Sequence, residues 1–202
     1  MAEHRLFQGE IPYVSTAEFH ADRERAPHLE QEWHRPRLLK AAEFIREAAA
    51  LHGGNAMVSD LGCGDGGLLS IIQGNENVIQ AWGYDFAPAN AAGWVERGVD
   101  ARALDVFGAD WGKIGAGNIV VMTEVLEHLA DPHGVLDRLR FHVATTWLVC
   151  SSPWNETPHS HCEEHAWAWD MDGYAAMIQA AGWQIRRHEQ VGLFQVVQAQ
   201  RP

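Results

Sequence analysis

Apolar residues recur along the chain with two alternating spacings, and this alternation predicts an α/β fold. Residues 36–51 carry an apolar residue every three or four positions, as one face of a helix does. Pro36 suits the first turn of that helix, and Gly53-Gly54 ends it. Short apolar runs are typical of strands buried on both faces of a parallel sheet, and they occur at 57–58, 78–83, 99–104, 118–122 and 145–151.

The segments between and after these runs complete the pattern. Helical spacing returns at 68–72, at 89–97 and after Asp131-Pro132, where Asp is a suitable cap and Pro suits the first turn. Residues 154–169 show no period and predict a loop, after which Asp170 caps another helix. Two last strands, 183–188 and 193–199, form a hairpin. The fold class is therefore α/β, with a Rossmann-like, mostly parallel sheet, helices on both faces and a C-terminal antiparallel hairpin.

Residues 1–35 have no clean period, whereas the predicted helices and strands all lie within the domain of residues 36–202. The N-terminal part is either a solvated arm or a cap that folds over the ligand. A chain of 202 residues with 47% apolar residues suits one globular domain. The net charge of −12 makes nucleic acid an unlikely partner, and no apolar run is long enough to cross a membrane. Three cysteines with no pair spacing favour a reduced, cytoplasmic setting.

The most informative stretch is a glycine-rich turn between the first predicted strand and the next helix. Strand, glycine turn and helix open many nucleotide-binding units, because glycines let backbone N–H groups approach a ligand closely. The pattern Gly62-x-Gly64-x-x-Gly67 also satisfies the dinucleotide fingerprint. Asp60 discriminates between the ligands, since a carboxylate there suits an ammonium and a sulfonium better than a pyrophosphate. These two groups occur together in S-adenosylmethionine (SAM).

The stretch Asp60-Leu61-Gly62-Cys63-Gly64-Asp65-Gly66 closely resembles motif I of the class I SAM-dependent methyltransferases. The resemblance extends over about residues 36–200 and implies their seven-stranded sheet. It also implies that SAM is the cofactor. The residues that it places at the cofactor within the motif are Asp60, Gly62, Cys63, Gly64, Asp65 and Gly66.

Further cofactor contacts are predicted at the ends of the following strands, which meet at one edge of the sheet. Asp85 lies 25 residues after Asp60 and is placed to accept hydrogen bonds from the ribose hydroxyls, with Phe86 on the adenine face. The family resemblance places Asp105 at the adenine amino group and the backbone N–H of Val106 at the ring. Thr123 and Glu124, at the end of the fourth strand, complete the predicted cofactor set.

Methyl transfer to a hydroxyl or amine requires in-line positioning and, often, a base. His128 and His165 are the candidate catalytic residues, because histidine titrates near neutral pH. The segment Glu124-Val125-Leu126-Glu127-His128, with His161 and His165 later in the chain, also resembles the metal site of the Hen1-type RNA 2′-O-methyltransferases. That resemblance implies a divalent metal on Glu124, Glu127, His128 and His165. The same segment is equally common in ubiquinone-biosynthesis-type enzymes, which need no such metal.

The predicted function is transfer of a methyl group from SAM to an oxygen or nitrogen of a small molecule. Three alternatives stay open: a metal-assisted RNA 2′-O-methyltransferase, a nicotinamide-dependent dehydrogenase, and a SAM-fold module that binds a partner without catalysis. The sequence determines neither the acceptor nor the oligomeric state.

Overall fold

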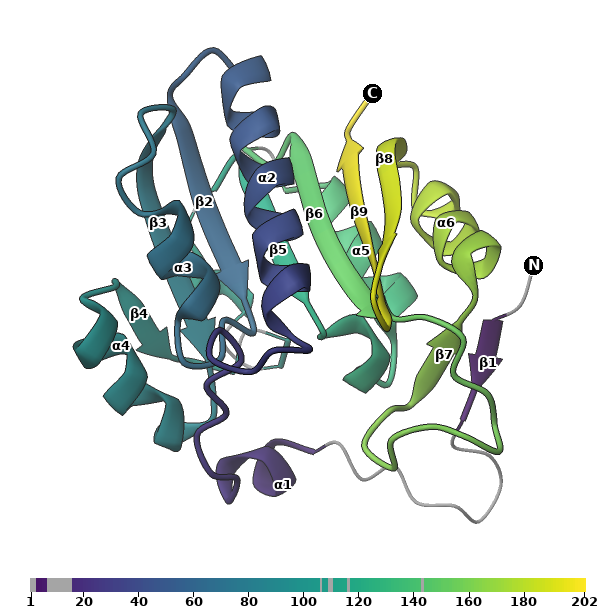
Figure 1. The fold of residues 1–202 in the computed structure, drawn as a ribbon. Coiled ribbons are helices and arrows are strands. Elements are labelled where there is room, and N and C mark those ends of the chain that lie inside the picture. The colour runs from purple at the N-terminus through teal and green to yellow at the C-terminus, as the bar shows by residue number, and fades with distance from the viewer. Residues whose placement is uncertain (1–2, 7–15, 106, 109–110, 116, 143) are drawn as a thin grey trace.

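The computed structural model describes residues 3–6, 16–105, 107–108, 111–115, 117–142 and 144–202 (Figure 1). A seven-stranded sheet forms the centre, in the order β4-β3-β2-β5-β6-β9-β8. Its first five strands along the chain pair in parallel, and β9 lies antiparallel between β6 and β8. The strands are β2 (Ala56–Leu61), β3 (Val78–Asp85), β4 (Ala101–Ala103), β5 (Ile119–Thr123), β6 (Trp147–Pro153), β8 (Gln184–Val191) and β9 (Phe194–Gln200). The predicted mostly parallel sheet and closing hairpin are confirmed.

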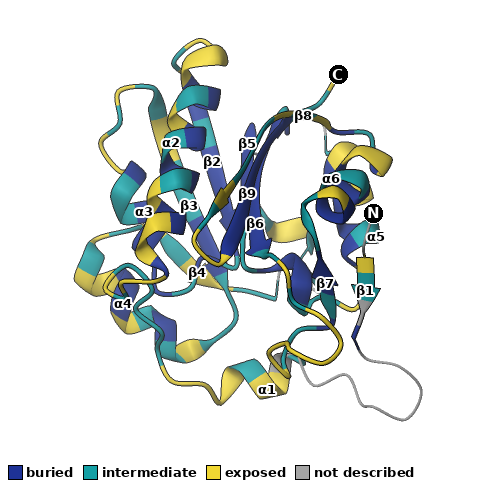
Figure 2. Ribbon diagram, turned by 45° about the vertical axis from the view of Figure 1, so that its right-hand side comes forward, coloured by how far each residue is buried: buried dark blue, intermediate teal, exposed yellow. Residues whose placement is uncertain are grey.

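Helices cover both faces of this sheet (Figure 1). One face carries α2 (Arg35–Leu51), α3 (Gly67–Ile72) and α4 (Ala91–Arg97), and its core includes Phe44 and Leu69. The opposite face carries α5 (Pro132–Arg140) and α6 (Met171–Ala180), packed around Leu136 and Tyr174. Figure 2 shows the central strands buried between these layers. The apolar runs are continuous because both strand faces are covered.

The predicted helix starts agree with local hydrogen bonds. Asp131 accepts a hydrogen bond from the N–H of Gly134 at 2.9 Å and begins α5, with Pro132 in the first turn. Asp170 accepts from the N–H of Gly173 at 2.7 Å and begins α6. Short 3₁₀ turns complete the connections at η1 (Pro88–Asn90), η2 (Trp111–Lys113) and η3 (Leu126–His128).

The structure differs from the sequence prediction in the N-terminal part and in the segment before α6. The segment 154–169 was expected to be a loop throughout, yet it ends in β7 (Trp167–Trp169), which pairs antiparallel with β1 (Glu3–Arg5). The Trp169 indole N–H donates to Glu3 at 2.8 Å and strengthens this pairing. A further helix, α1 (Ala17–Ala21), lies in the N-terminal part, for which no element was predicted. Both strands are only three residues long, so neither carries a readable period.

No helix among the described residues has the length and apolar character needed to cross a membrane.

Candidate active site

A cavity of about 620 Å³ opens at the carboxyl ends of β2, β3, β4 and β5. Segments 62–65, 84–87, 104–105 and 123–125 line it from the sheet, and α5 closes one side. Residues of the N-terminal segment 16–28 line it from outside the sheet. Ligands of open α/β sheets bind at this edge. Nine of the predicted cofactor residues line the cavity: Gly62, Cys63, Gly64, Asp65, Asp85, Phe86, Asp105, Thr123 and Glu124.

The glycine turn is held against the neighbouring strand by its own backbone. The N–H groups of Gly62 and Cys63 both donate to the carbonyl of Tyr84, at 2.8 and 3.0 Å. Gly62 has a φ of +79°, and a Cβ added there would lie 2.5 Å from Cγ2 of Val125. Only glycine fits this close approach without strain. Gly66, although predicted to bind cofactor, begins α3 in the left-handed conformation and lies outside the cavity lining.

Asp85 connects the turn to the end of β3. One carboxylate oxygen accepts from the N–H of Gly64 at 2.9 Å, and the other accepts from the N–H of Ala87 and the amide of Asn90, at 2.8 and 3.2 Å. A carboxylate offers about four acceptor positions, so these three bonds fix its orientation and leave capacity for a ligand hydroxyl. Phe86 follows it in the cavity wall.

Asp60 occupies a different position from the one predicted. It is only 1% exposed and lies beneath the turn, and it is absent from the cavity lining. Neither of its carboxylate oxygens has a hydrogen-bond partner among the described residues. Burial, with the nearby Asp85 charge, raises the pKa of Asp60 to about 7, and Arg37 acts in the opposite direction. Asp60 therefore lies beneath the site, whereas Asp85 and Asp105 line the same cavity.

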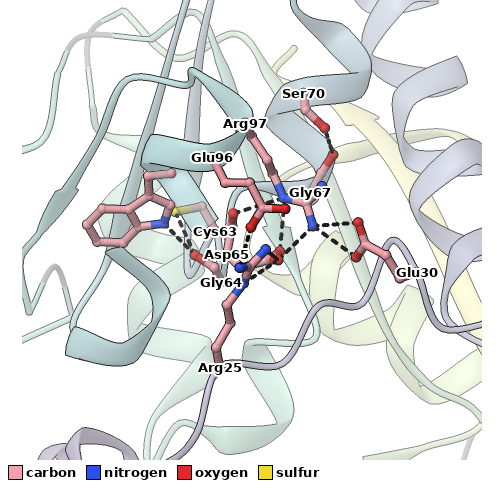
Figure 3. A network of polar contacts seen from close by, with 10 residues as sticks. Arg25, Glu30, Cys63, Gly64, Asp65, Gly67, Ser70, Glu96 and Arg97 are labelled. Carbon is pink, nitrogen blue, oxygen red and sulfur yellow. Dashed lines mark hydrogen bonds and ion pairs between the residues drawn. The ribbon is translucent and has the colours of Figure 1, made fainter. Parts of the chain in front are cut away.

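The Asp65 carboxylate is engaged by two arginines (Figure 3). Arg97 donates to it at 2.7 Å and Arg25 at 3.1 Å, and the N–H of Gly67 donates to its other oxygen at 3.2 Å. Arg97 also pairs with Glu30 at 2.9 Å. The network ties the N-terminal segment and α4 to the glycine turn. Asp65 lines the cavity, but its charge is balanced by arginines of the same chain.

A second polar group lies where η3 meets the segment before β7. One ligand atom each of Glu127, His128 and His165 lies within 4.8 Å of the others. Glu127 is fully buried, and within the part of the chain that the structure describes neither of its carboxylate oxygens has a hydrogen-bond partner. Burial, and next the charge of Glu124, raises its pKa well above the ordinary value. Burial, and next His165, lowers the pKa of His128 well below its ordinary value, so the ring is neutral at pH 7.

Glu124 of the predicted metal set, and His161, which was singled out beside that set, are not members of this group. Glu124 accepts a hydrogen bond from Ser151 at 2.9 Å and faces Arg37, whose Nε lies 3.9 Å away. Its φ of +58°, uncommon for a residue with a side chain, belongs to the sharp turn that ends β5. His161 is exposed, with its ring nitrogen 2.6 Å from the Cys162 carbonyl. The structure thus brings together three of the five residues singled out.

Comparison with known proteins places the chain in a family. Residues 32–199 match a family model described as a methyltransferase domain. The chain belongs to the class I SAM-dependent methyltransferases. This membership decides against the nicotinamide-dependent alternative. A trans-aconitate 2-methyltransferase of Mycobacterium sp. (strain KMS) is 33% identical over 107 residues, which cover 52% of this chain and 41% of that protein. The match thus extends over less than half of the relative's length.

Solved structures share the methyltransferase fold. The N-methyltransferase NodS of Bradyrhizobium japonicum WM9, solved with S-adenosyl-L-homocysteine, superposes with a TM-score of 0.68 at 13% identity, covering 94% of this chain and 98% of that one. The methyltransferase domain of a bacterial Hen1, CtHen1, superposes with a TM-score of 0.61 at 16% identity, covering 84% and 100%. At these identities the likeness concerns the fold alone.

Sequence reasoning missed Arg37, a basic residue of this methyltransferase cavity. Its side chain is 1% exposed, and no described residue forms a hydrogen bond with its Nε or Nη1. The ring of His34 lies 3.2 Å from Nη2, and Phe194 lies 5.1 Å from the guanidinium carbon. Burial lowers its pKa, opposed first by Glu124. One signal was available: Arg37, Ala41, Phe44 and Ala48 share the buried face of α2 at helical spacing.

The remaining predicted positions divide between the cavity and its border. His128 lines the cavity, whereas His165 lies behind it, with ring centroids 4.8 Å apart. The His20 ring of α1 lies 5.4 Å from that of His128 and 5.5 Å from Phe86, so the N-terminal segment reaches the same place. Val106 lies outside the described residues.

Proposed function

We propose that this chain transfers the methyl group of SAM to an oxygen or nitrogen of a small-molecule acceptor. The observation that carries the proposal is the convergence of four strand ends and one glycine turn on a single cavity. Family membership supports the cofactor. The mycobacterial relative is named for a small carboxylic acid, trans-aconitate, which supports a small acceptor.

The cavity offers matching groups for each part of the cofactor. Asp85 would accept from the ribose hydroxyls, with Phe86 on the adenine face and Asp105 at the adenine amino group. Arg37 would take the carboxylate of the methionine part, because its Nε and Nη1 form no hydrogen bond with a described residue, the side chain lines the cavity, and arginine binds carboxylates well. The carboxyl groups of Glu124 and Asp60, when ionised, would attract the ammonium and the sulfonium of SAM.

His128 is the proposed base. Its Nδ1 lies 3.2 Å from the carbonyl of Glu164, which can only accept, so Nδ1 carries the proton of the neutral ring. The lone pair then lies on Nε2. Because its pKa is depressed, His128 stays neutral at pH 7 and can accept the proton that a hydroxyl or amine loses on methylation.

Calorimetry with purified protein tests the cofactor. We expect binding of SAM and S-adenosylhomocysteine, and an affinity for SAM about 10- to 100-fold weaker in Arg37→Met, since a hydrogen bond to a charged group contributes about 1.5–3 kcal/mol. Arg35→Met is the matched control, because Arg35 is exposed on the same helix turn. Binding of NAD without SAM would refute the proposal. Methylation of a metabolite extract separates an enzyme from a binding module.

A second candidate function is metal-assisted transfer to a hydroxyl, including an RNA 2′-hydroxyl. The observation that favours it is the buried Glu127 carboxylate without a partner, beside His128 and His165. Two imidazoles and one carboxylate suit a divalent cation. The Nδ1 atoms of both rings are engaged by acceptors, as is usual for metal-binding histidines. A bound cation would lower the pKa of an acceptor hydroxyl.

Metal titration tests the second candidate. After dialysis against a chelator, wild-type protein should bind one equivalent of Mn²⁺ or Zn²⁺, and Glu127→Gln should bind none. Glu163→Gln, an exposed residue of the neighbouring loop, should bind like the wild type. If no metal is retained or activates the enzyme, this candidate fails and the metal-free mechanism stands. Methylation of an RNA oligonucleotide but not of its 2′-deoxy counterpart would identify the RNA 2′-O activity.

We further propose that residues 16–35 form a cap over the cavity. Arg23 pairs with Glu164 on one side, and Arg25 pairs with Asp65 at 3.1 Å on the other, so the segment is attached at both sides of the opening. Arg25→Met should therefore weaken SAM binding and increase proteolysis within the segment. Arg102→Met, an exposed arginine of β4, is the control. Equal proteolysis in both variants would favour a solvated arm.

A further inference from the structure

We infer that Glu156 is a positioning residue, which holds the His165 ring in the one tautomer and orientation that presents Nε2 to Glu127 and His128. The inference rests on the proposed function only in assuming that His165 acts at this site, whether as a base or as a metal ligand. Sequence reasoning gave Glu156 no role.

The Glu156 carboxylate connects two parts of the loop between β6 and β7. One oxygen lies 2.7 Å from Nδ1 of His165, and the other accepts a hydrogen bond from the N–H of Cys162 at 3.2 Å. Both side chains of the pair are shielded, with 17% of Glu156 and 11% of His165 exposed. An antiparallel bridge between Thr157 and Ser160 turns the chain between these contacts.

The backbone around His165 is fixed on the opposite side as well. Its own N–H donates to the Cys162 carbonyl at 3.0 Å. The next residue, Ala166, donates to the Glu127 carbonyl at 2.6 Å and so attaches the loop to η3. Within this frame the main freedom left to His165 is the rotation and tautomer of its ring. The Glu156 contact removes that freedom.

The chemistry of the pair then determines which nitrogen faces the group. An ionised carboxylate only accepts hydrogen bonds, so Nδ1 of His165 must carry a proton. When the ring is neutral, its lone pair lies on Nε2. A ring nitrogen of His165 lies within 4.8 Å of the ligand atoms of Glu127 and His128.

Nuclear magnetic resonance tests the inference without relying on activity. Long-range ¹H–¹⁵N spectra of uniformly ¹⁵N-labelled, chelator-treated full-length protein report the tautomer of each histidine, and His165→Gln assigns the signal. Wild-type protein should show His165 protonated at Nδ1. Glu156→Ala should shift it to a mixture that includes the Nε2–H form. Glu156→Gln has nearly the same shape, but its single carbonyl oxygen faces two donors, the His165 ring and the Cys162 N–H. This variant should therefore retain more of the Nδ1–H form than Glu156→Ala.

Activity provides the second readout. Removal of such a supporting partner typically lowers activity or metal affinity by about 10- to 100-fold. We expect this loss in kcat for Glu156→Ala with an unchanged Kd for SAM, since Glu156 does not line the cavity. Glu163→Gln removes a charge from the same loop and should change neither readout.

A wild-type Nε2–H tautomer, or an Nδ1–H signal unchanged in Glu156→Ala, would overturn the inference even in an active enzyme. Conversely, failure to bind SAM would refute the proposed function and leave the tautomer result intact.

Discussion

Replacing Asp60 by asparagine tests how burial controls the charge beneath the glycine turn. Asp60 is 1% exposed and its pKa is raised from 3.8 to about 7 in the folded protein. Between these values the folded state keeps a proton that the unfolded state has released. The free energy of unfolding therefore falls as pH rises, by about 1.4 kcal/mol per pH unit, or about 4 kcal/mol over the whole interval.

Asparagine has nearly the shape of protonated aspartate but cannot ionise. Below about pH 4 the two proteins should have similar stability, and the Asp60→Asn variant should become increasingly more stable than wild type as pH rises. Between pH 5 and pH 7 we expect the difference in unfolding free energy to grow by about 2 kcal/mol, because the slope halves near the folded pKa.

Urea denaturation of cofactor-free protein at half-unit pH steps measures this difference. Asp137→Asn is the control, because it makes the same substitution at an exposed acid of α5. Parallel stability curves for wild type and Asp60→Asn would refute the reasoning. They would mean that Asp60 is ionised in the folded protein, with a partner that stabilises its charge.

Three further predictions concern the same edge of the sheet. Gly62→Ala should destabilise the protein by about 1–3 kcal/mol in thermal denaturation, because its Cβ meets Val125 at 2.5 Å with φ at +79°; an unchanged melting temperature would contradict this close approach. Arg97→Met removes the 2.7 Å contact to Asp65, which supports the glycine turn, and should weaken SAM binding measured by calorimetry. Equal SAM affinity in the variant and the wild type would show that the arginine network does not support the turn. Glu127→Gln should stabilise chelator-treated protein at pH 7.5 in urea denaturation, because the folded wild type retains a proton on Glu127 that the unfolded chain releases, whereas glutamine does not titrate; a loss of stability would show that the carboxylate has a stabilising partner.

The alternation of apolar spacings predicted the layers of the fold, because helices and strands place side chains on a face with fixed periods. The caps Asp131 and Asp170 were readable for the same reason, since each bonds to an N–H three residues ahead. The positions of the glycine turn and Asp85 followed from parallel strands ending at one edge. The periodicity and the caps depend on residues close in sequence. The common position of the glycine turn and Asp85 depends on the parallel topology of the sheet.

Other features of the site depend on residues distant in sequence. The pairing of β1 with β7 joins segments that lie more than 160 residues apart in the sequence, and no local pattern predicts it. The sequence placed Asp60 and Asp65 together at the cofactor, but the structure buries one and engages the other with Arg25 and Arg97. Charge and burial at a position depend on which side chains approach from other elements.

By itself the sequence determined the fold class, the family and the edge of the sheet where a ligand binds, because periodicity and the glycine motif are local properties. Only the tertiary structure decided which acids face the cavity, that Arg37 lies buried beside it, and that Glu127, His128 and His165 meet while Glu124 faces elsewhere. Those outcomes depend on distances of a few ångströms between elements, and a linear pattern does not contain such distances.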